Sequence, residues 1–281
     1  EGFVPTGFNR ALSLTSGVIV IRIDGHSAID ADFIKNCMMS LKNTDADCVG
    51  GIIKNISKGI FGHLVNIAQS SKFGVGGVAF REDAKEGMYV DTLAFGAYKR
   101  QVFEKIGAYD EELIRNQDDE FNFRLIQNGG KIWLDPSIKS VYYPRNSLKK
   151  LFKQYFQYGF YKVRVMQKRS GIASFRHLVP GLFVLALLLS LAITPLALIP
   201  FFTIAGVYIL TNIIATVVEI RNSFKQVFWM FILLPITFFI LHFSYGLGFL
   251  TALIKFWNKW FDTEVKDSLF NRDQFMQNSE G

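Results

Sequence analysis

The chain has 281 residues, 50% of them hydrophobic, and a formal net charge of +7. The basic excess lies just before a long uncharged stretch, where anionic lipid headgroups explain it more simply than a nucleic acid does, so we expect no nucleic-acid partner. Cys37 and Cys48, the only cysteines, fit a reduced compartment, and their spacing matches no zinc pattern.

The first predicted elements are a short helix over residues 8–16 and a strand over residues 18–23, an order that favours an α/β fold. The strand is a continuous apolar run, typical of a strand buried on both faces of a parallel sheet. It stops at an Asp-Gly-His turn. Because open α/β sheets bind ligands where strands end, Asp24 and His26 stand where a metal or other ligand is expected. An ordinary turn with a surface histidine is the alternative, and the motif alone slightly favours it.

Three further elements continue the expected sheet domain. Residues 30–43 are predicted to form a helix that Asp30 caps, with apolar residues at helical spacing. A strand is predicted over residues 47–53, where a glycine pair allows close backbone approach. A second helix is predicted over residues 60–71.

Two segments with weaker signals follow. Residues 73–80 are glycine-rich, but they match neither a P-loop nor a dinucleotide fingerprint, so a flexible loop is the favoured interpretation. Residues 89–98 are predicted to form a strand with Asp91 inside it, followed by a helix through Lys105. Asp91 either pairs with a nearby arginine or faces a cleft, and the two alternatives carry equal weight.

Residues 116–121 (NQDDEF) form a second chemical centre. Asn116 is expected to cap a helix that stops at a glycine pair, and acidic residues in the first turn suit the helix dipole. This structural role is enough to explain the presence of an aspartate at position 118 or 119. It accounts less well for three consecutive carboxylates. Their negative charges repel one another unless a bound cation, or a proton held for a proton-transfer role, reduces the repulsion. A carboxylate with a raised pKa in a cleft is what general-base catalysis needs.

The next stretch leads from the sheet domain to the apolar region. A last short strand is expected at residues 132–134, with a turn at Asp135 and Pro136. Residues 147–169 show apolar positions at helical spacing and basic residues in other directions. We expect this helix to lie in the membrane interface with its apolar side toward lipid. A plain core helix is the alternative, which the basic excess and the following apolar run disfavour.

The carboxyl-terminal third predicts a membrane region. Residues 178–218 carry no charge, which is enough for two spans of ~20 residues joined by a turn at residues 195–200. Residues 227–254 form a third crossing or a re-entrant pair of half-helices. Basic residues before the first span place the head in the cytoplasm by the positive-inside rule. Lys255 and Lys259 argue mildly against a simple third crossing, so the final topology stays open.

The order of these pieces resembles that of the bacterial membrane-associated glycosyltransferases of family 2, in particular the glucosyltransferases of succinoglycan-type exopolysaccharide synthesis. The similarity rests on a strand ending in DGH, on VDTLAFGAYKR, IGAYDEELIRNQDDEFNFRLIQNGGKIWLDP, YYPR and KQYFQYGFYK, and on the spans. It covers nearly the whole chain. The NQDDE stretch in its context is specific, whereas DGH alone would not be.

The resemblance implies a GT-A-like fold, here a partial α/β head with a mixed sheet, and a divalent metal cofactor, Mn²⁺ or Mg²⁺. Asp24 and His26 match the first and third positions of the family's DxD signature, where histidine in place of aspartate suits Mn²⁺ better than Mg²⁺. Asp118 occupies the place of the catalytic base, with Glu120 two residues on. Asp119 competes for that assignment, because adjacent acids allow a register error of one. A bound cation would neutralise the diphosphate leaving group while the base takes the acceptor proton.

The remaining expected site residues are substrate-binding. They are Asp91, Gly76, Gly77, Gly96, Arg145 and Gln154. Two departures from the family pattern matter. The QxxRW motif of processive synthases is missing, since YFQYG follows Gln154, and this favours transfer of a single sugar. The family's first strands, which bind the nucleoside base, are also missing, so we expect a fragment that lacks its amino-terminal part, and its activity without that part stays open.

These observations predict four regions: a partial GT-A-like catalytic domain (1–146), an amphipathic interface helix and linker (147–177), a transmembrane region with about three apolar segments (178–257) and a polar tail (258–281). The chain is expected to sit in the bacterial inner membrane as a multi-pass protein with a cytoplasmic head.

The expected function is inverting transfer of one hexose, with glucose as a candidate, from a nucleotide sugar to a polyprenyl-diphosphate-linked glycan. The donor is expected to be a UDP-sugar, and the process exopolysaccharide or cell-surface polysaccharide synthesis. The alternatives are a non-catalytic membrane scaffold with a degenerate head and a processive polysaccharide synthase. A transporter is disfavoured, because the spans carry almost no polar residues. The mechanism requires that Asp24 and Asp118 face one cleft.

Overall fold

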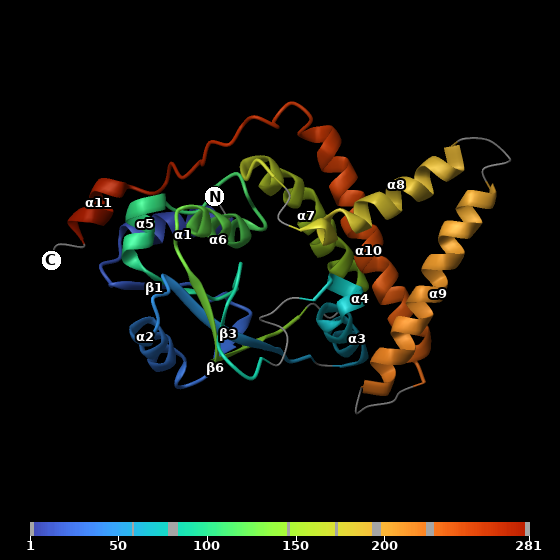
Figure 1. Cartoon of the computed structure of the whole chain (residues 1–281), viewed down its shortest axis with the longest axis horizontal. Coiled ribbons are helices and arrows are strands. Elements are labelled where there is room, and N and C mark those ends of the chain that lie inside the picture. The colour runs from blue at the N-terminus through green and yellow to red at the C-terminus, as the bar shows by residue number, and fades with distance from the viewer. Residues whose placement is uncertain are drawn as a thin grey trace.

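The computed structural model describes residues 3–57, 59–77, 84–144, 147–171, 174–192, 198–222 and 228–278. It has an α/β head built on a mixed sheet, and a layer of helices on one side of that head (Figure 1). The head comprises α1 (Val4–Ser13), β1 (Ile19–Ile21), β2 (Ser27–Ile29), α2 (Phe33–Asn43), β3 (Cys48–Asn55), β4 (Met88–Tyr89), β5 (Ala97–Lys99), α5 (Arg100–Ile106), α6 (Gln117–Gln127) and β6 (Ile132–Tyr142). The helical layer comprises α3 (Gly59–Ser70), α4 (Lys72–Val75), α7 (Leu148–Lys168), the 3₁₀ helix η2 (Phe175–His177), α8 (Val179–Ala192), α9 (Leu198–Asn222) and α10 (Met230–Lys255).

The sheet has the order β1-β5-β3-β6-β2, and β4 also pairs with β6. Only the β3–β6 pair is parallel among the described strands. The prediction of a fully buried parallel strand over residues 18–23 was wrong, since β1 is a short, half-buried strand antiparallel to β5. The strand is apolar at successive positions because side chains on both of its faces are packed. Ile19 and Ile21 pack toward α2, whereas Val20 packs on the opposite face of the sheet.

The glycine pair of the second predicted strand has the expected role. A Cβ on Gly51 would lie 1.7 Å from the carbonyl oxygen of Ile138, and one on Gly50 would lie 3.0 Å from Leu93 Cδ1. The register of β3 against β6 shifts at this point. The expected turn at Asp135 and Pro136 was wrong, because β6 continues through both residues, and this irregularity in the ladder accommodates a proline.

Two other boundaries differ from prediction. Residues 89–98 form the ends of two short strands, β4 and β5, with an irregular loop between them. Asp91 therefore lies in an exposed loop and not in a strand. Residues 72–75 form the short helix α4, so only Gly76 and Gly77 of the described part of the glycine-rich segment lie in a loop. The helix α2 begins at Phe33, with Asp32 and not Asp30 at its N-cap.

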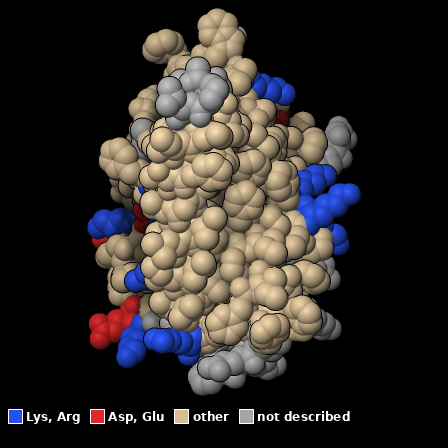
Figure 2. Space-filling model, turned by 90° about the vertical axis from the view of Figure 1, so that its right-hand side faces the viewer, with Lys and Arg blue, Asp and Glu red and all other residues tan. Residues whose placement is uncertain are grey.

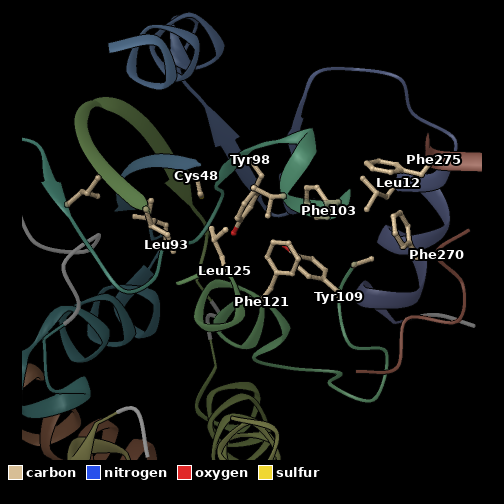
Figure 3. Close-up of a cluster of buried hydrophobic side chains, with 14 residues drawn as sticks. Leu12, Cys48, Leu93, Tyr98, Phe103, Tyr109, Phe121, Leu125, Phe270 and Phe275 are labelled. Carbon is tan, nitrogen blue, oxygen red and sulfur yellow. The ribbon is translucent and has the colours of Figure 1, made fainter. Parts of the chain in front are cut away.

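The main core of the head lies between the sheet and the helices α1, α5 and α6. Phe103 stacks on Phe121 at 5.0 Å between ring centroids, and Tyr109 meets Phe121 edge-on at 5.1 Å. Figure 3 shows that Phe270 and Phe275, from the far end of the chain, lie beside Leu12, and the Phe275 ring also lies 6.5 Å from that of Phe103 between centroids. Residues 258–278, expected as a polar tail, thus return to the head, where α11 (Arg272–Gln277) packs near α1 (Figure 1).

The amphipathic helix α7 packs along α10, not on lipid. A Cβ on Gly159 would lie 2.0 Å from the Tyr245 carbonyl oxygen, and one on Gly248 would lie 2.1 Å from the Phe156 carbonyl oxygen. Such close backbone approach is typical of small residues at helix interfaces in membranes. The expectation that the apolar side of α7 faces lipid was therefore wrong, because α3 and α10 cover most of it.

The helices α9 and α10 have 25 and 26 residues, and both are long and apolar enough to cross a membrane. At 14 residues, α8 is shorter than the ~20 that a span needs. The helix α10 continues through Pro235, so a re-entrant pair of half-helices at residues 227–254 is excluded. Figure 2, which views the side formed by α8 and α9, shows a broad surface without charge and with basic residues at its margins. Two apolar helices and this face indicate a membrane protein.

Candidate functional site

A cleft of about 310 Å³ lies where the head meets the helical layer. It is lined by the segment after β1, the loop before β5, the start of α6, one side of α7, and η2. Asp24 and Asp118 both line it, as the sequence predicted. The two acidic motifs, far apart in the chain, therefore share one site.

Arg22 fixes the first acidic group. Its Nη2 and Nε atoms donate to Asp24 Oδ1 at 2.6 and 3.1 Å. Burial opposes charge on Arg22, but the nearby Tyr109, Asp118 and Asp24 outweigh it and raise its pKa above the ordinary value. Arg22 is thus a permanent cation that interacts with both acidic centres.

His26 follows Asp24 by two residues and immediately precedes β2. Its carbonyl oxygen accepts a hydrogen bond from the Tyr143 amide at 3.1 Å. Its ring meets Tyr142 edge-on, with the centroids 4.9 Å apart. The antiparallel β2–β6 pair therefore orients this imidazole at the cleft.

Asp118 lies in the first turn of α6 and accepts a hydrogen bond on Oδ1 from the Asp119 amide at 3.0 Å. Burial raises its pKa; Arg22 opposes this, and the Asp119 and Asp24 carboxylates add to it. Asn116 was expected to cap the helix with its side chain, but it makes no such hydrogen bond. It adopts a left-handed conformation with φ 63°, and its Nδ2 donates to the Tyr158 carbonyl oxygen of α7 at 3.0 Å.

Asp119 lies in the opposite electrostatic environment. Lys162 Nζ lies 2.7 Å from its Oδ2, and Arg169 Nη2 lies 3.1 Å from its Oδ1. Burial alone would raise the pKa of Asp119, but Lys162 and Arg169 hold it well below its usual range. Asp119 therefore joins α6 to α7, whereas Asp118 is the carboxyl suited to exchange a proton.

Glu120 is directed away from the cleft. Its carboxylate pairs with Arg124 at 2.9 Å, and Arg124 also donates to the carbonyl oxygens of Ile106 and Ala108. Glu120 is buried in the head and does not line the cleft. Its contacts are those of a structural ion pair.

The expected substrate-binding residues divide into two groups. Gln154 lines the cleft, whereas Gly76 and Gly77 do not; their carbonyl oxygens accept hydrogen bonds from Arg176, which does line it. Asp91 and Gly96 do not line it. A Cβ on Gly96 would lie 2.7 Å from Cys48 Sγ, so this glycine is required for packing. Arg145 lies outside the described residues.

Four basic residues that line the cleft were not predicted from the sequence as site residues. They are Arg22, Lys162, Arg176 and His177. Arg22 precedes Asp24 by two residues, a spacing that puts both on one side of an extended chain. Lys162 and Arg169 are seven residues apart, which places them on one face of α7. No pattern in the sequence distinguishes Arg176 or His177 from the basic residues around them.

The residues at the cleft suit a cation that is shared with a substrate. The described part of the chain holds no group of three metal-binding side chains. Asp24 and His26 supply two, and one oxygen of Asp24 is engaged by Arg22. A site of this kind commonly uses one or two carboxylates completed by substrate phosphates; here Asp24 supplies one carboxylate, and the imidazole of His26 suits a transition-metal cation better than Mg²⁺.

Two curated proteins are similar to this chain. The dolichyl N-acetyl-α-D-glucosaminyl phosphate 3-β-D-2,3-diacetamido-2,3-dideoxy-β-D-glucuronosyltransferase of Methanococcus voltae is 33% identical over 254 residues, which are 88% of this chain and 74% of that protein. The succinoglycan biosynthesis protein ExoA of Rhizobium meliloti (strain 1021) is 31% identical over 161 residues, which are 57% of this chain and 48% of that protein. No family model matches the chain.

Proposed function

The chain belongs to the glycosyltransferases of the family-2 type, and on this premise we propose that it transfers one hexose, with inversion, from a nucleotide sugar to a lipid-linked glycan. One relative acts on a dolichyl-linked sugar phosphate and the other serves succinoglycan biosynthesis. A polyprenyl-diphosphate-linked acceptor in exopolysaccharide or cell-surface polysaccharide synthesis, a UDP-sugar donor and a GT-A-like head are parts of this proposal.

The observation that carries the proposal is the shared cleft of Asp24 and Asp118. In the proposed reaction Asp118 accepts the proton of the acceptor hydroxyl as that oxygen forms a bond to the anomeric carbon. The bond from this carbon to the diphosphate breaks on the opposite face, which inverts the configuration. A raised pKa makes Asp118 a stronger base than an ordinary aspartate.

The cationic groups of the cleft stabilise the opposite charge. Arg22 is fixed by Asp24 and offers a positive field to the departing diphosphate. Asp24 and His26 would hold a divalent cation, Mn²⁺ or Mg²⁺, which when bound supplies Lewis-acid stabilisation of that leaving group. Lys162 and Arg169 hold Asp119, and so fix the helix turn that carries Asp118.

We also propose that α9 and α10 are two membrane crossings, that α8 does not cross, and that the head is cytoplasmic. Segments on both sides of these helices are joined: Arg164 Nη2 lies 2.6 Å from Asp262 Oδ2, and Gln167 Nε2 donates to the Phe256 carbonyl oxygen at 2.7 Å. Contacts between these two segments support the proposal of two crossings. The exposed Lys149, Lys150 and Lys153 favour the cytoplasmic side for the head.

A transfer assay tests the function. The full chain in lipid nanodiscs receives UDP-hexoses, Mn²⁺ and a polyprenyl-diphosphate-linked glycan, and the product is analysed by mass spectrometry and by NMR of its anomeric linkage. We expect addition of one hexose with inverted configuration. A ladder of products would indicate a processive synthase, and no transfer to any acceptor by the full-length protein would favour the scaffold.

The topology has a separate test. A cysteine introduced at Phe228, between α9 and α10, is expected to react with a membrane-impermeant maleimide from outside intact cells, whereas one at the exposed Phe261 is not. Equal protection of both positions would contradict the two crossings.

A further inference from the structure

A second cavity, of about 690 Å³, lies next to the cleft. Its walls come from α4, η2, the start of α8, and the facing sides of α9 and α10. Most of the lining side chains are apolar. Among the described residues, Lys72 and Arg176 are its charged lining groups and none is acidic.

The cavity and the cleft adjoin each other and share part of their walls. Tyr155, Arg176, His177 and Tyr245 line both of them. A ligand at this junction would therefore have one end among apolar side chains and the other end beside Asp118 and Asp119. The apolar end is bounded by α9, whose opposite side belongs to the uncharged surface of Figure 2.

The junction contains buried polar groups without a partner in the described structure. They are the Tyr245 hydroxyl and His177 Nδ1. Buried polar atoms are nearly always hydrogen-bonded in folded proteins, so atoms of this kind at a cavity bond to whatever fills it, water or a ligand. Tyr245 can donate, His177 can donate from Nδ1, and Arg176 adds a positive charge at the same place. This set of donors suits an anion such as a phosphate.

An apolar cavity that ends at an anion site fits an amphiphile. We propose that the cavity binds the isoprenoid chain of the lipid-linked acceptor, and that Arg176, His177 and Tyr245 bind its adjoining phosphate. The attached sugar then lies in the cleft, where its hydroxyl reaches Asp118. This inference rests on the proposed function, and it adds how the enzyme distinguishes a lipid-linked acceptor from a soluble sugar.

Substitutions on the two sides of α9 give the first test. Ile204 lines the cavity, whereas Ile213, nine residues later, lies on the opposite face of the helix and is exposed. Ile204→Trp should raise KM for a long-chain polyprenyl-linked acceptor about tenfold or more, equal to ~1.4 kcal/mol. It should leave kcat/KM for an analogue with one isoprene unit within about twofold, and Ile213→Trp should change neither. Equal effects of the two variants on both acceptors would overturn the proposal.

Photolabelling gives a test that needs no sugar transfer. A polyprenyl phosphate with a diazirine at the end of its chain should label peptides of α4, α9 and α10 in the wild-type chain, and Ile204→Trp should reduce this labelling. Labelling only of the outer side of α9, or equal labelling by a phospholipid with a diazirine in its acyl chain, would overturn the proposal. Specific labelling without transfer would reject the proposed function and keep the binding site.

The phosphate contact is tested by Tyr245→Phe, which removes one hydroxyl and keeps the ring. We expect KM for the long-chain acceptor to rise about fivefold with little change in kcat, in the range of one hydrogen bond to a charged group. An unchanged KM would remove Tyr245 from the phosphate site.

Discussion

Asp118 and Asp119 are neighbours in the chain, yet their carboxylates lie in opposite environments. Lys162 and Arg169 hold Asp119 at 2.7 and 3.1 Å. Asp118 lines the cleft close to Asp24, and its pKa is raised where that of Asp119 is lowered. Adjacent residues on a helix point about 100° apart, so one turn can present one carboxylate to substrate and the other to a neighbouring helix.

The first prediction concerns these two residues. Asp118→Asn should lower kcat by about 10²–10⁴, because the base is lost. It should leave the melting temperature equal or higher, since burial already disfavours the charge on Asp118. Transfer kinetics and thermal unfolding in detergent measure the two effects. Unchanged turnover would remove the assignment of the base.

The matched variant, Asp119→Asn, should act mainly on stability. It leaves Lys162 and Arg169 largely buried without their carboxylate, which costs about 3–5 kcal/mol when a buried pair is broken. We expect a lower melting temperature with any remaining folded enzyme still active. A stable Asp119→Asn protein with no activity would exchange the roles of the two residues.

The pH profile is the second prediction. Because the pKa of Asp118 is raised, activity should fall on the acid side at a pH above the ordinary aspartate value of 3.8. Against the effect of burial, Lys162 and Arg169 lower the pKa of Asp119, and Arg164 and Lys259, 3.0 and 2.8 Å from the Glu112 carboxylate, lower that of Glu112. The stability these two carboxylates contribute is complete above their ordinary pKa values of 3.8 and 4.5 and is lost only as the pH falls below them. Activity should therefore decline while the chain is still folded. Simultaneous loss of activity and of near-UV circular dichroism would contradict this order.

The third prediction concerns the cation. Asp24→Ala and His26→Ala should each weaken Mn²⁺ binding, measured by electron paramagnetic resonance in the presence of UDP, and lower Mn²⁺-dependent transfer. Removal of metal with EDTA should have the same effect on the unsubstituted chain. If both variants keep full Mn²⁺ affinity and activity, the non-catalytic scaffold gains support.

The fourth prediction tests the return of the chain to the head. Phe275 is fully buried, so Phe275→Ala should lower the free energy of unfolding by about 3–5 kcal/mol. Phe261 is 97% exposed, and Phe261→Ala should change it by less than about 0.5 kcal/mol. Chemical denaturation followed by tryptophan fluorescence compares the two. Similar effects would show that the tail does not belong to the core of the head.

The fifth prediction tests the α7–α10 interface. Gly248→Ala would place a Cβ 2.1 Å from the Phe156 carbonyl oxygen, so we expect about 1–3 kcal/mol of destabilisation from overpacking. Gly206→Ala on α9 meets nothing within 4 Å and should be neutral or slightly stabilising. Thermal unfolding of the two alanine variants in nanodiscs provides the comparison.

Much of the fold could be predicted from local patterns. The periodicity of residues 30–43 and 147–169 and the glycine pair at the second strand identified real helices and a real close approach. What could not be predicted was which strands pair with each other and which helices pack together. An apolar run such as that before Asp24 is the same whether its faces pack in a parallel or an antiparallel sheet, so β1 was misjudged. The apolar side of α7 likewise does not say whether lipid or α10 covers it.

The candidate site, like the fold, could be predicted only where it depends on a local sequence pattern. Acidic motifs such as NQDDEF stand out in a sequence, and the expectation of one cleft for Asp24 and Asp118 is confirmed. The roles of Asp118 and Asp119 could not be separated, because Lys162 and Arg169 lie more than 40 residues away in the chain. Glu120 belongs to the same acidic motif, but its ion pair with Arg124 shows that its role is structural.

The buried positions of Phe270 and Phe275 have a consequence for biosynthesis. Both residues leave the ribosome after α8, α9 and α10, so the cluster around Phe103 and Tyr109 cannot close until those apolar helices have been made. Maturation of the transferase head is thereby completed only after the apolar helices have been synthesised. A nascent chain that ends before Phe270 leaves aromatic residues of this cluster exposed, and exposed apolar surface is recognised by chaperones and proteases.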